Sequence, residues 1–302
     1  MMAYKFLNWA ASTSLAIALI GCGSGGDEHN GRTSNADTLD TTAKTTEAGL
    51  MVIGGKIFSI PSPVQTALLI RKLGLPYEKS LPMPADAIEK FVTKAQRSLA
   101  LGAYGADLAY VTVHKDGQRA LNTLQVVQKI SAQLELSNAF DQEMMDGFKK
   151  SISNEDSLLR FTGKAFRMAD QYLKNNNRDD VSALVLAGGW IEGMYLTLSN
   201  TNEKSDASLT DRLGDQRKTI ENLIMLLERT DTEKSQGALI AGLKDALSAY
   251  AGVTTAYQFQ TPTVDAEKKT TYVNSTSTVS MTPEQFKAIA AKVKALRTLI
   301  TA

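Results

Sequence analysis

Cysteine is nearly absent from this chain of 302 residues, in which Cys22 has no second cysteine to pair with. A disulfide within the chain and a cysteine-rich metal site are therefore excluded. Histidine is almost as scarce, with His29 and His114. Two histidines cannot supply a histidine-rich metal site or a bundle di-metal centre built from paired E-x-x-H motifs. We therefore expect no metal and no cofactor.

Catalytic motifs that can be recognised by residue spacing are missing as well. The sequence contains no G-x-S-x-G, no H-E-x-x-H and no Walker loop. The formal net charge is +1, which gives no electrostatic reason to expect nucleic acid as a partner. These absences favour a non-enzymatic protein that does not bind nucleic acid.

The first 22 residues resemble a signal peptide that ends at the single cysteine. Positive charge at Lys5 precedes an apolar stretch centred on Leu15–Ile20, as in a signal peptide. The stretch ends in Leu19-Ile20-Gly21-Cys22, which resembles the bacterial lipobox. The resemblance implies removal of residues 1–21 and a lipid on the Cys22 sulfur that holds the mature chain in a membrane. An uncleaved anchor is the alternative, but the apolar run is short for a membrane span.

Residues 22–50 predict a flexible tether. They are rich in Gly, Ser, Thr, Asn, Asp and Glu and almost free of large apolar side chains, so they cannot bury enough surface to order themselves. Such a tether reaches roughly 25–30 Å. We expect an exported protein on the outer membrane, at its periplasmic or surface face, with a folded domain at 51–302.

The sequence predicts that the folded domain is mostly α-helical, either a multi-helix bundle or a helical array. Its apolar residues recur at spacings of three and four, as on helices with one buried face. In the last helix Thr282 is a good N-cap, with Pro283 and Gln285 completing the start signal. The apolar stripe of that helix comprises Phe286, Ile289, Val293, Leu296 and Ile300. Other helices are expected at 63–73, 85–113 with a break near Gly102 and Gly105, about 121–134, 139–150, 155–173, about 209–227 and about 239–247.

Two segments depart from this pattern. Residues 254–281 alternate Thr, Tyr, Val and Ser around a polar turn, which predicts a small exposed β-hairpin before the last helix. Residues 181–198 are apolar on nearly every side. Three glycines, the carboxylate of Glu192 and polar flanks favour a buried central helix there, and a membrane span is the alternative.

Two patches that combine glycine, aromatic and acidic residues are the candidate ligand-binding sites. Each places one carboxylate in an apolar stretch, where an ionised acid is costly unless it has a partner. In the first patch Tyr104, Asp107 and His114 share a helix face by their spacing. The candidates are Tyr104, Asp107, His114, Trp190, Glu192 and Tyr195. Three interpretations stay open: structural polar clusters, a ligand pocket, or catalysis if the two carboxyl groups meet with separated pKa values.

Four segments resemble a family of Bacteroidota lipoproteins whose activity is uncharacterised. They are IPSPVQTALLIRK (60–72), LALGAYGADLAYVTV (99–113), LLRFTGKAFRMADQYL (158–173) and LVLAGGWIEGMYL (184–196). The resemblance implies the compartment and a helical fold, and it transfers no site residue.

The sequence therefore favours a lipid-anchored cell-envelope protein that binds a partner protein or a small ligand without catalysis. One alternative is a carboxylate-dependent hydrolase or sugar-processing enzyme with Asp107 and Glu192 as its pair. The other is an accessory subunit of an outer-membrane complex.

Overall fold

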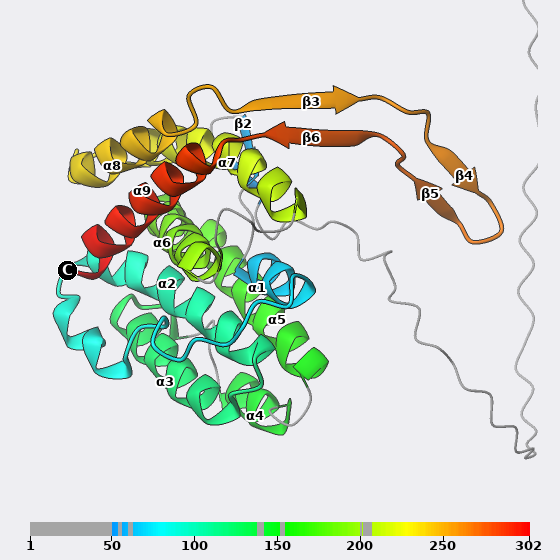
Figure 1. Ribbon diagram of the computed structural model, residues 1–302. Helices are drawn as coiled ribbons and strands as arrows, with labels where there is room; N and C mark the ends of the chain where they lie inside the picture. The colour runs from blue at the N-terminus through cyan, green and yellow to red at the C-terminus, as the bar shows by residue number, and fades with distance from the viewer. Residues whose placement is uncertain are drawn as a thin grey trace, which may run out of the picture. The chain divides into compact units, whose positions relative to one another are not determined.

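The computed structural model describes residues 50–53, 56–59, 63–137, 142–151, 155–199, 201 and 207–302. All of them belong to one unit of the chain, Lys44–Ala302. The predicted signal peptide, Cys22 and nearly all of the predicted tether lie outside the described residues. Within them, the predicted fold class is confirmed: the chain is mostly helical, with a β-hairpin before the C-terminal helix (Figure 1).

Helix α6 (Asp179–Ser199) and helix α2 (Lys94–Val113) form the centre of the fold. Both are buried along most of their length because their sequences are apolar on nearly every side. Among the described helices, α6 is the one long and apolar enough to cross a membrane, yet 83% of its most apolar window is buried inside the protein. The expected buried central helix is thus what the structure contains.

Glycines bring α2 and α6 unusually close together. A Cβ on Gly102 would collide with the carbonyl oxygen of Val185, and a Cβ on Gly188 with that of Leu99. Helix α2 runs straight through this contact, so the predicted break near Gly102 and Gly105 is wrong. The glycines serve a close approach between helices, whereas the chain breaks earlier, at Thr93, whose side chain makes a capping box with Gln96.

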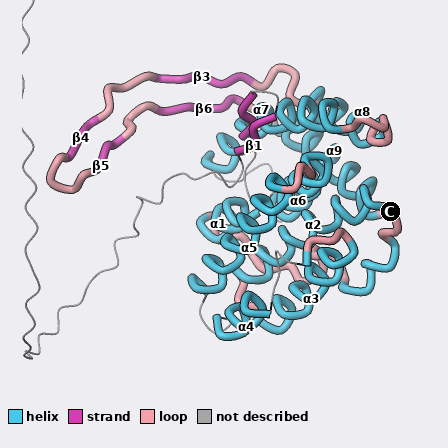
Figure 2. Tube along the Cα trace, turned by 180° about the vertical axis from the view of Figure 1, so that it is seen from behind, coloured by secondary structure: helices cyan, strands magenta, loops and turns pink. Residues whose placement is uncertain are grey.

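Seven further α-helices surround this pair, counted within the described ranges (Figure 2). Helices α1, α3 and α5 contact α2, while α7 and α9 contact α6, and α8 packs between α7 and α9. Their bounds are α1 Pro63–Lys72, α3 Gly117–Gln133, α4 Gln142–Ser151, α5 Glu155–Asn175, α7 Ala207–Thr230, α8 Gly237–Ser248 and α9 Pro283–Thr301. The predicted stripe of α9 is buried along its whole length.

The predicted hairpin is a long two-stranded arm, defined here as residues 254–280. Strand β3 (Thr254–Gln258) pairs with β6 (Thr276–Ser280), and farther out β4 (Thr263–Asp265) pairs with β5 (Thr270–Tyr272), both antiparallel. The arm extends away from the helices in both views (Figures 1 and 2). A third antiparallel pair, β1 (Leu50–Ile53) with β2 (Lys56–Ser59), is one that the helical spacing did not predict.

Candidate functional site

A proline-rich segment lies across helix α2. This segment, named the strap here, comprises residues 73–93 between α1 and α2 and includes the short 3-10 helix η1 (Ala85–Lys90). Pro76, Pro82 and Pro84 lack backbone N–H groups and disfavour a continuous helix. Apolar side chains hold the strap down, because Met83, Ile88 and Phe91 are buried in the core.

Polar side chains of α2 bind the backbone of the strap. The N–H of Met83 donates to Asp107 Oδ2 at 3.0 Å, and the hydroxyl of Tyr104 donates to the carbonyl of Pro84 at 2.7 Å. The hydroxyl of Tyr110 accepts from the N–H of Glu78 at 2.9 Å. Two of the candidate residues, Tyr104 and Asp107, therefore provide hydrogen-bond partners for backbone groups of a segment that has no regular ladder.

The two candidate carboxyl groups meet in the interior. Asp107 and Glu192, named the carboxyl pair here, are both 0% exposed and lie close enough together for each to shift the pKa of the other. Arg297 of α9 completes the cluster, with its Nε 3.3 Å from Glu192 Oε2. Its guanidinium also lies over the ring of Tyr195, 4.7 Å from the ring centre. One buried cluster thus links α2, α6 and α9.

Both carboxyl groups of the pair have raised pKa values. Burial, and then the charge of Glu192, raise the pKa of the Asp107 carboxyl well above its usual range. Burial raises the pKa of Glu192 from 4.5 to about 7, against the opposing effect of Arg297. Asp107 Oδ1 and Glu192 Oε1 have no amide, hydroxyl or guanidinium donor among the described residues. A proton on one carboxyl group that is donated to the other would provide the hydrogen bond that these two oxygens lack.

The remaining candidates lie in other places. Trp190 donates from its indole nitrogen to Gln216 Oε1 of α7 at 2.9 Å. His114 ends α2 and contacts two aromatic rings, with ring-centre distances of 4.9 Å to Tyr77 and 4.6 Å to Tyr110. The shared face predicted for Tyr104, Asp107 and His114 therefore does not make one site.

Arg297 is the member of the cluster that the sequence analysis missed. It follows Val293 of the buried α9 stripe by four residues, a spacing that places both on one side of a helix. The position of Arg297 beside an apolar stripe could have indicated that it pairs with a buried acid elsewhere in the chain. Tyr110 is not among the predicted site residues. Its hydroxyl binds the strap, and the spacing of apolar residues does not predict where the strap lies.

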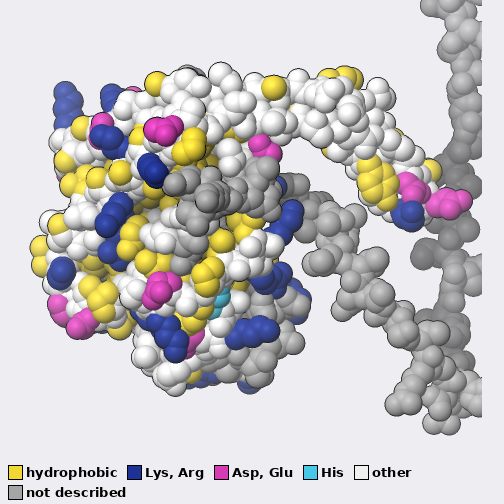
Figure 3. Space-filling model, in the orientation of Figure 1, with side chains coloured by type: hydrophobic (Ala, Val, Ile, Leu, Met, Phe, Trp, Pro, Cys, Tyr) yellow, Lys and Arg dark blue, Asp and Glu magenta, His cyan; other side chains and the backbone are white. Residues whose placement is uncertain are grey.

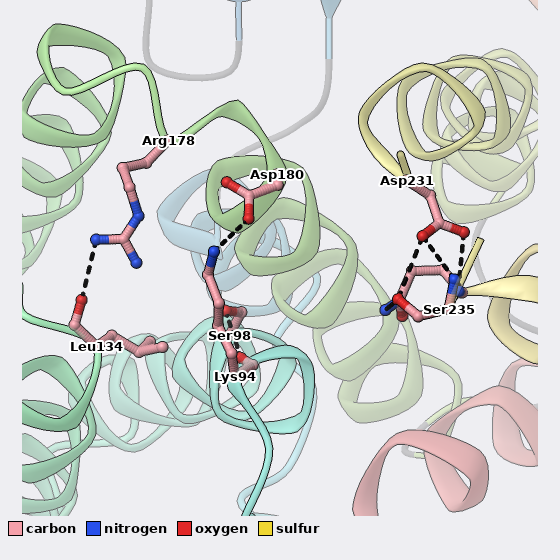
Figure 4. A network of polar contacts seen from close by, with 8 residues as sticks. Lys94, Ser98, Leu134, Arg178, Asp180, Asp231 and Ser235 are labelled. Atoms are coloured by element: carbon pink, nitrogen blue, oxygen red, sulfur yellow. Dashed lines mark hydrogen bonds and ion pairs between the residues drawn. The ribbon is translucent and has the colours of Figure 1, made fainter. Parts of the chain in front are cut away.

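One surface cleft lies where several helix ends converge, and its volume is about 410 Å³. It is bordered by the start of α2, the start of α6 and the turn from α7 to α8. Several of its polar side chains are engaged with one another or with backbone (Figure 4). Lys94 pairs with Asp180 at 2.6 Å, and the two oxygens of Asp231 accept from the N–H groups of Ser235 and Gln236, each at 2.8 Å.

A smaller cleft of about 370 Å³ lies between the strap and α3. Met83, Pro84, Asp116 and Arg119 are among its lining residues. Neither cleft is lined by a member of the carboxyl pair. No cluster of metal-ligating side chains occurs in the part of the chain that the structure describes.

The arm carries large apolar side chains in solvent (Figure 3). These side chains, named the arm patch here, have exposed fractions between 45% and 76%. They are Tyr257, Phe259, Val264, Tyr272 and Val273. Scattered exposed apolar residues are ordinary, whereas a gathering of them on one projecting element is typical of an interaction surface.

The two edges of the arm differ. At its base, the N–H of Val279 in β6 donates to Asp211 Oδ1 of α7 at 2.7 Å, and the Val279 side chain packs against Gly214 of the same helix. Every residue of β3 is exposed. Helix α7 thus covers the base of the β6 edge and leaves the β3 edge open.

The chain was compared with protein-family models, curated proteins and solved structures, and none of them matches it.

Proposed function

We propose that this protein is a lipid-anchored component of the cell envelope that binds a partner protein through its arm and has no catalytic role. The observation that carries the proposal is the arm itself, an exposed hairpin with the arm patch on its surface and an open strand edge. A two-stranded hairpin is marginally stable by itself in water. A protein partner that covers it adds the missing stabilisation.

The chemistry of the β3 edge suits addition of a strand. Natural proteins protect exposed edges with charged residues, prolines or bulges. Strand β3 has the sequence TTAYQ, with no charge and no proline. An extended segment of a partner can therefore pair with β3 through main-chain hydrogen bonds, while its side chains contact the arm patch.

The register identifies which groups of β3 face the open edge. Thr255 lies opposite Val279, whose N–H is given to Asp211 instead of to β3. Thr255 and Val279 are therefore a non-hydrogen-bonded pair, in which the N–H and C=O of Thr255 point away from β6. The N–H of the next residue, Ala256, points toward β6.

This register supplies a matched pair of variants. Thr255→Pro removes an outward N–H and leaves the pairing of β3 with β6 intact, so we expect it to abolish partner binding while the arm still forms. Tyr257→Ser tests the arm patch independently. A photo-crosslinking residue at Val273, used in intact envelopes, should give one specific adduct that both variants lose. The same crosslinker at Val92, 66% exposed on the strap, is the control position.

The proposal is wrong if the adduct at Val273 persists in the Thr255→Pro and Tyr257→Ser variants, or if an identical adduct forms from Val92. The accessory-subunit alternative is tested by the same crosslinks, because it requires the adduct to contain an outer-membrane protein.

The anchor is the second part of the proposal and rests on Leu19-Ile20-Gly21-Cys22. Cys22→Ala should prevent incorporation of labelled palmitate and release the protein from membranes in a high-salt wash. Labelling that survives this substitution would contradict lipidation at Cys22.

The enzymatic alternative lacks support from the site. The carboxyl pair is fully buried, and each acid is already engaged by strap backbone or by Arg297. A hydrolase needs its acid and base within hydrogen-bonding reach of a substrate. The geometry therefore favours the structural interpretation of these carboxylates.

A further inference from the structure

The carboxyl pair connects two peripheral elements to the core. Through Asp107 it holds the N–H of Met83 in the strap, and through Glu192 it holds Arg297 of α9. Met83 is 24 residues before Asp107, and Arg297 is 105 residues after Glu192. The strap and the last helix are thus fastened to the α2–α6 pair at one buried point.

We propose that the carboxyl pair is a proton-dependent clasp, which holds the strap and the C-terminal half of α9 when protonated and loosens both when it loses its protons. The geometry gives the reason. With one shared proton, Asp107 donates to Glu192, Glu192 pairs with Arg297, and no oxygen is left facing a like charge. With no proton, two negative charges are buried side by side with a single cation to compensate them.

The surroundings offer little other compensation for the second charge. On α2, Tyr104 is committed to the carbonyl of Pro84, and on α3 the guanidinium of Arg119 binds the strap carbonyls of Lys79 and Pro82. The titratable and charged groups around the pair are Tyr104 of α2, Asp86 of η1, Arg119 of α3, Tyr195 of α6 and Arg297 of α9. Arg297 is the cation in direct contact with the pair.

The transition falls in an accessible pH range. The pKa of Glu192 is raised to about 7 by burial, and the pKa of Asp107 is raised as well. Groups whose pKa is raised on folding stabilise the folded state at low pH, and this contribution is lost as the pH rises through the raised value. The clasp therefore holds at mildly acidic pH, where the pair keeps at least one proton, and weakens as the pH rises above about 7 and the last proton, on Asp107, is lost.

Hydrogen–deuterium exchange of the full chain tests the clasp at a single amide. The Met83 amide should lose protection by roughly tenfold between pH 6 and pH 8.5, after correction for the intrinsic exchange rate. The amide of Ser235 is a matched reference, because it also donates to a carboxylate, Asp231, at 2.8 Å but lies far from the pair in the turn before α8. Its corrected protection should stay constant over the same range.

Three variants separate a proton-dependent clasp from a merely structural cluster. The double variant Asp107→Asn/Glu192→Gln keeps shape and hydrogen-bonding groups but cannot titrate, so Met83 protection should become independent of pH. Arg297→Gln removes the cation that lowers the pKa of Glu192, so the loss of protection should move to higher pH. Glu228→Gln, which alters a surface carboxylate paired with Lys244, should match the wild type.

Constant Met83 protection from pH 6 to 8.5 in the wild type would overturn the proposal. So would an unchanged pH dependence in the double variant, or a midpoint that Arg297→Gln leaves in place. The wild-type and Arg297→Gln measurements decide the matter even if the double variant does not fold.

Discussion

At the scale of single residues, buried tyrosines show how differently the same side chain can act. Tyr104 and Tyr250 are each 1% exposed. The hydroxyl of Tyr104 donates to the carbonyl of Pro84, whereas the hydroxyl of Tyr250 has no hydrogen-bond partner among the described residues. The first hydroxyl fixes the strap, and the second is a buried polar atom that the fold tolerates.

Removing these two hydroxyls should therefore have opposite consequences. Tyr104→Phe leaves the Pro84 carbonyl without its donor and should lower the free energy of unfolding by about 1–2 kcal/mol. Tyr250→Phe removes an unsatisfied group and should leave stability unchanged or raise it slightly. Urea unfolding of both variants measures the difference. Equal losses in the two variants would show that the Pro84 contact contributes nothing specific.

At the scale of elements, the crossing of α2 and α6 depends on the absence of side chains. Gly188 lies so close to α2 that an added Cβ would meet the backbone of Leu99. Backbone cannot rotate away as a side chain can, so the two helices would have to separate. Separation would also pull Asp107 and Glu192 apart, because they lie on these helices.

Gly188→Ala should therefore be costly, with a loss of about 3 kcal/mol in the free energy of unfolding. Gly237, the first residue of α8, has nothing within 4 Å of an added Cβ. Gly237→Ala should be neutral or stabilising by up to about 1 kcal/mol, since alanine favours helix over glycine. Thermal unfolding of the two variants checks this contrast. A small loss of stability in Gly188→Ala would mean that α2 and α6 can separate at little cost.

Much of this architecture could be predicted from sequence because helices and their caps are local features. The start of α9 at Pro283 follows from Thr282 and Gln285, and the arm follows from alternating Thr and Tyr. The supposed break at Gly102 was wrong because a glycine that opens a helix and one that admits a neighbouring helix look alike in sequence. Only the partner distinguishes them, which for Gly102 is the backbone of Val185 and Gly189 on α6.

The candidate site was predicted less well than the fold. The sequence indicated that Asp107 and Glu192 each need a partner, and the structure pairs them. It could not indicate that Met83 and Arg297 would complete the cluster, because those contacts depend on how the strap and α9 dock. Spacing alone also assigned His114 to the same face, although ring contacts hold it at the far end of α2.

At the scale of the whole molecule, two sets of carboxylates act on stability in opposite directions. Burial acts to raise the pKa of Asp116, but hydrogen bonds from the Tyr77 hydroxyl and the Arg119 N–H outweigh burial, so the pKa is lowered overall. Burial likewise opposes the effect of Lys94 on Asp180, whose pKa is also lowered overall. The stability from these groups is present at neutral pH and is lost as the pH falls through their lowered values. The carboxyl pair acts the other way.

We therefore expect a melting temperature that is highest at about pH 4–5, just above the ordinary carboxyl range, and falls on both sides. For Glu192, the change in pKa from 4.5 to about 7 corresponds to about 3 kcal/mol. This stability is lost between about pH 4.5 and pH 7, which lowers the melting temperature by roughly 5–10 °C for a domain of this size. The alkaline fall should vanish in Asp107→Asn/Glu192→Gln while the acid fall remains. Calorimetry from pH 3 to 9 gives the profile, and a melting temperature that does not fall between pH 4.5 and pH 8 in the wild type would contradict it.

The pairing of α2 with α6 also sets the order in which the chain can fold. Helix α2 ends at Val113, but α6, its main partner in the centre of the fold, begins at Asp179, and the cation beside their carboxyl groups is Arg297. As the chain is made from its amino end, α2 can pack against α1 and α3 early, but its contact with α6 forms later, and Arg297 joins only with the last turns of α9. Completion of the core is thereby delayed until both α6 and α9 are present, and a truncation within α9 should leave the earlier helices without a finished core.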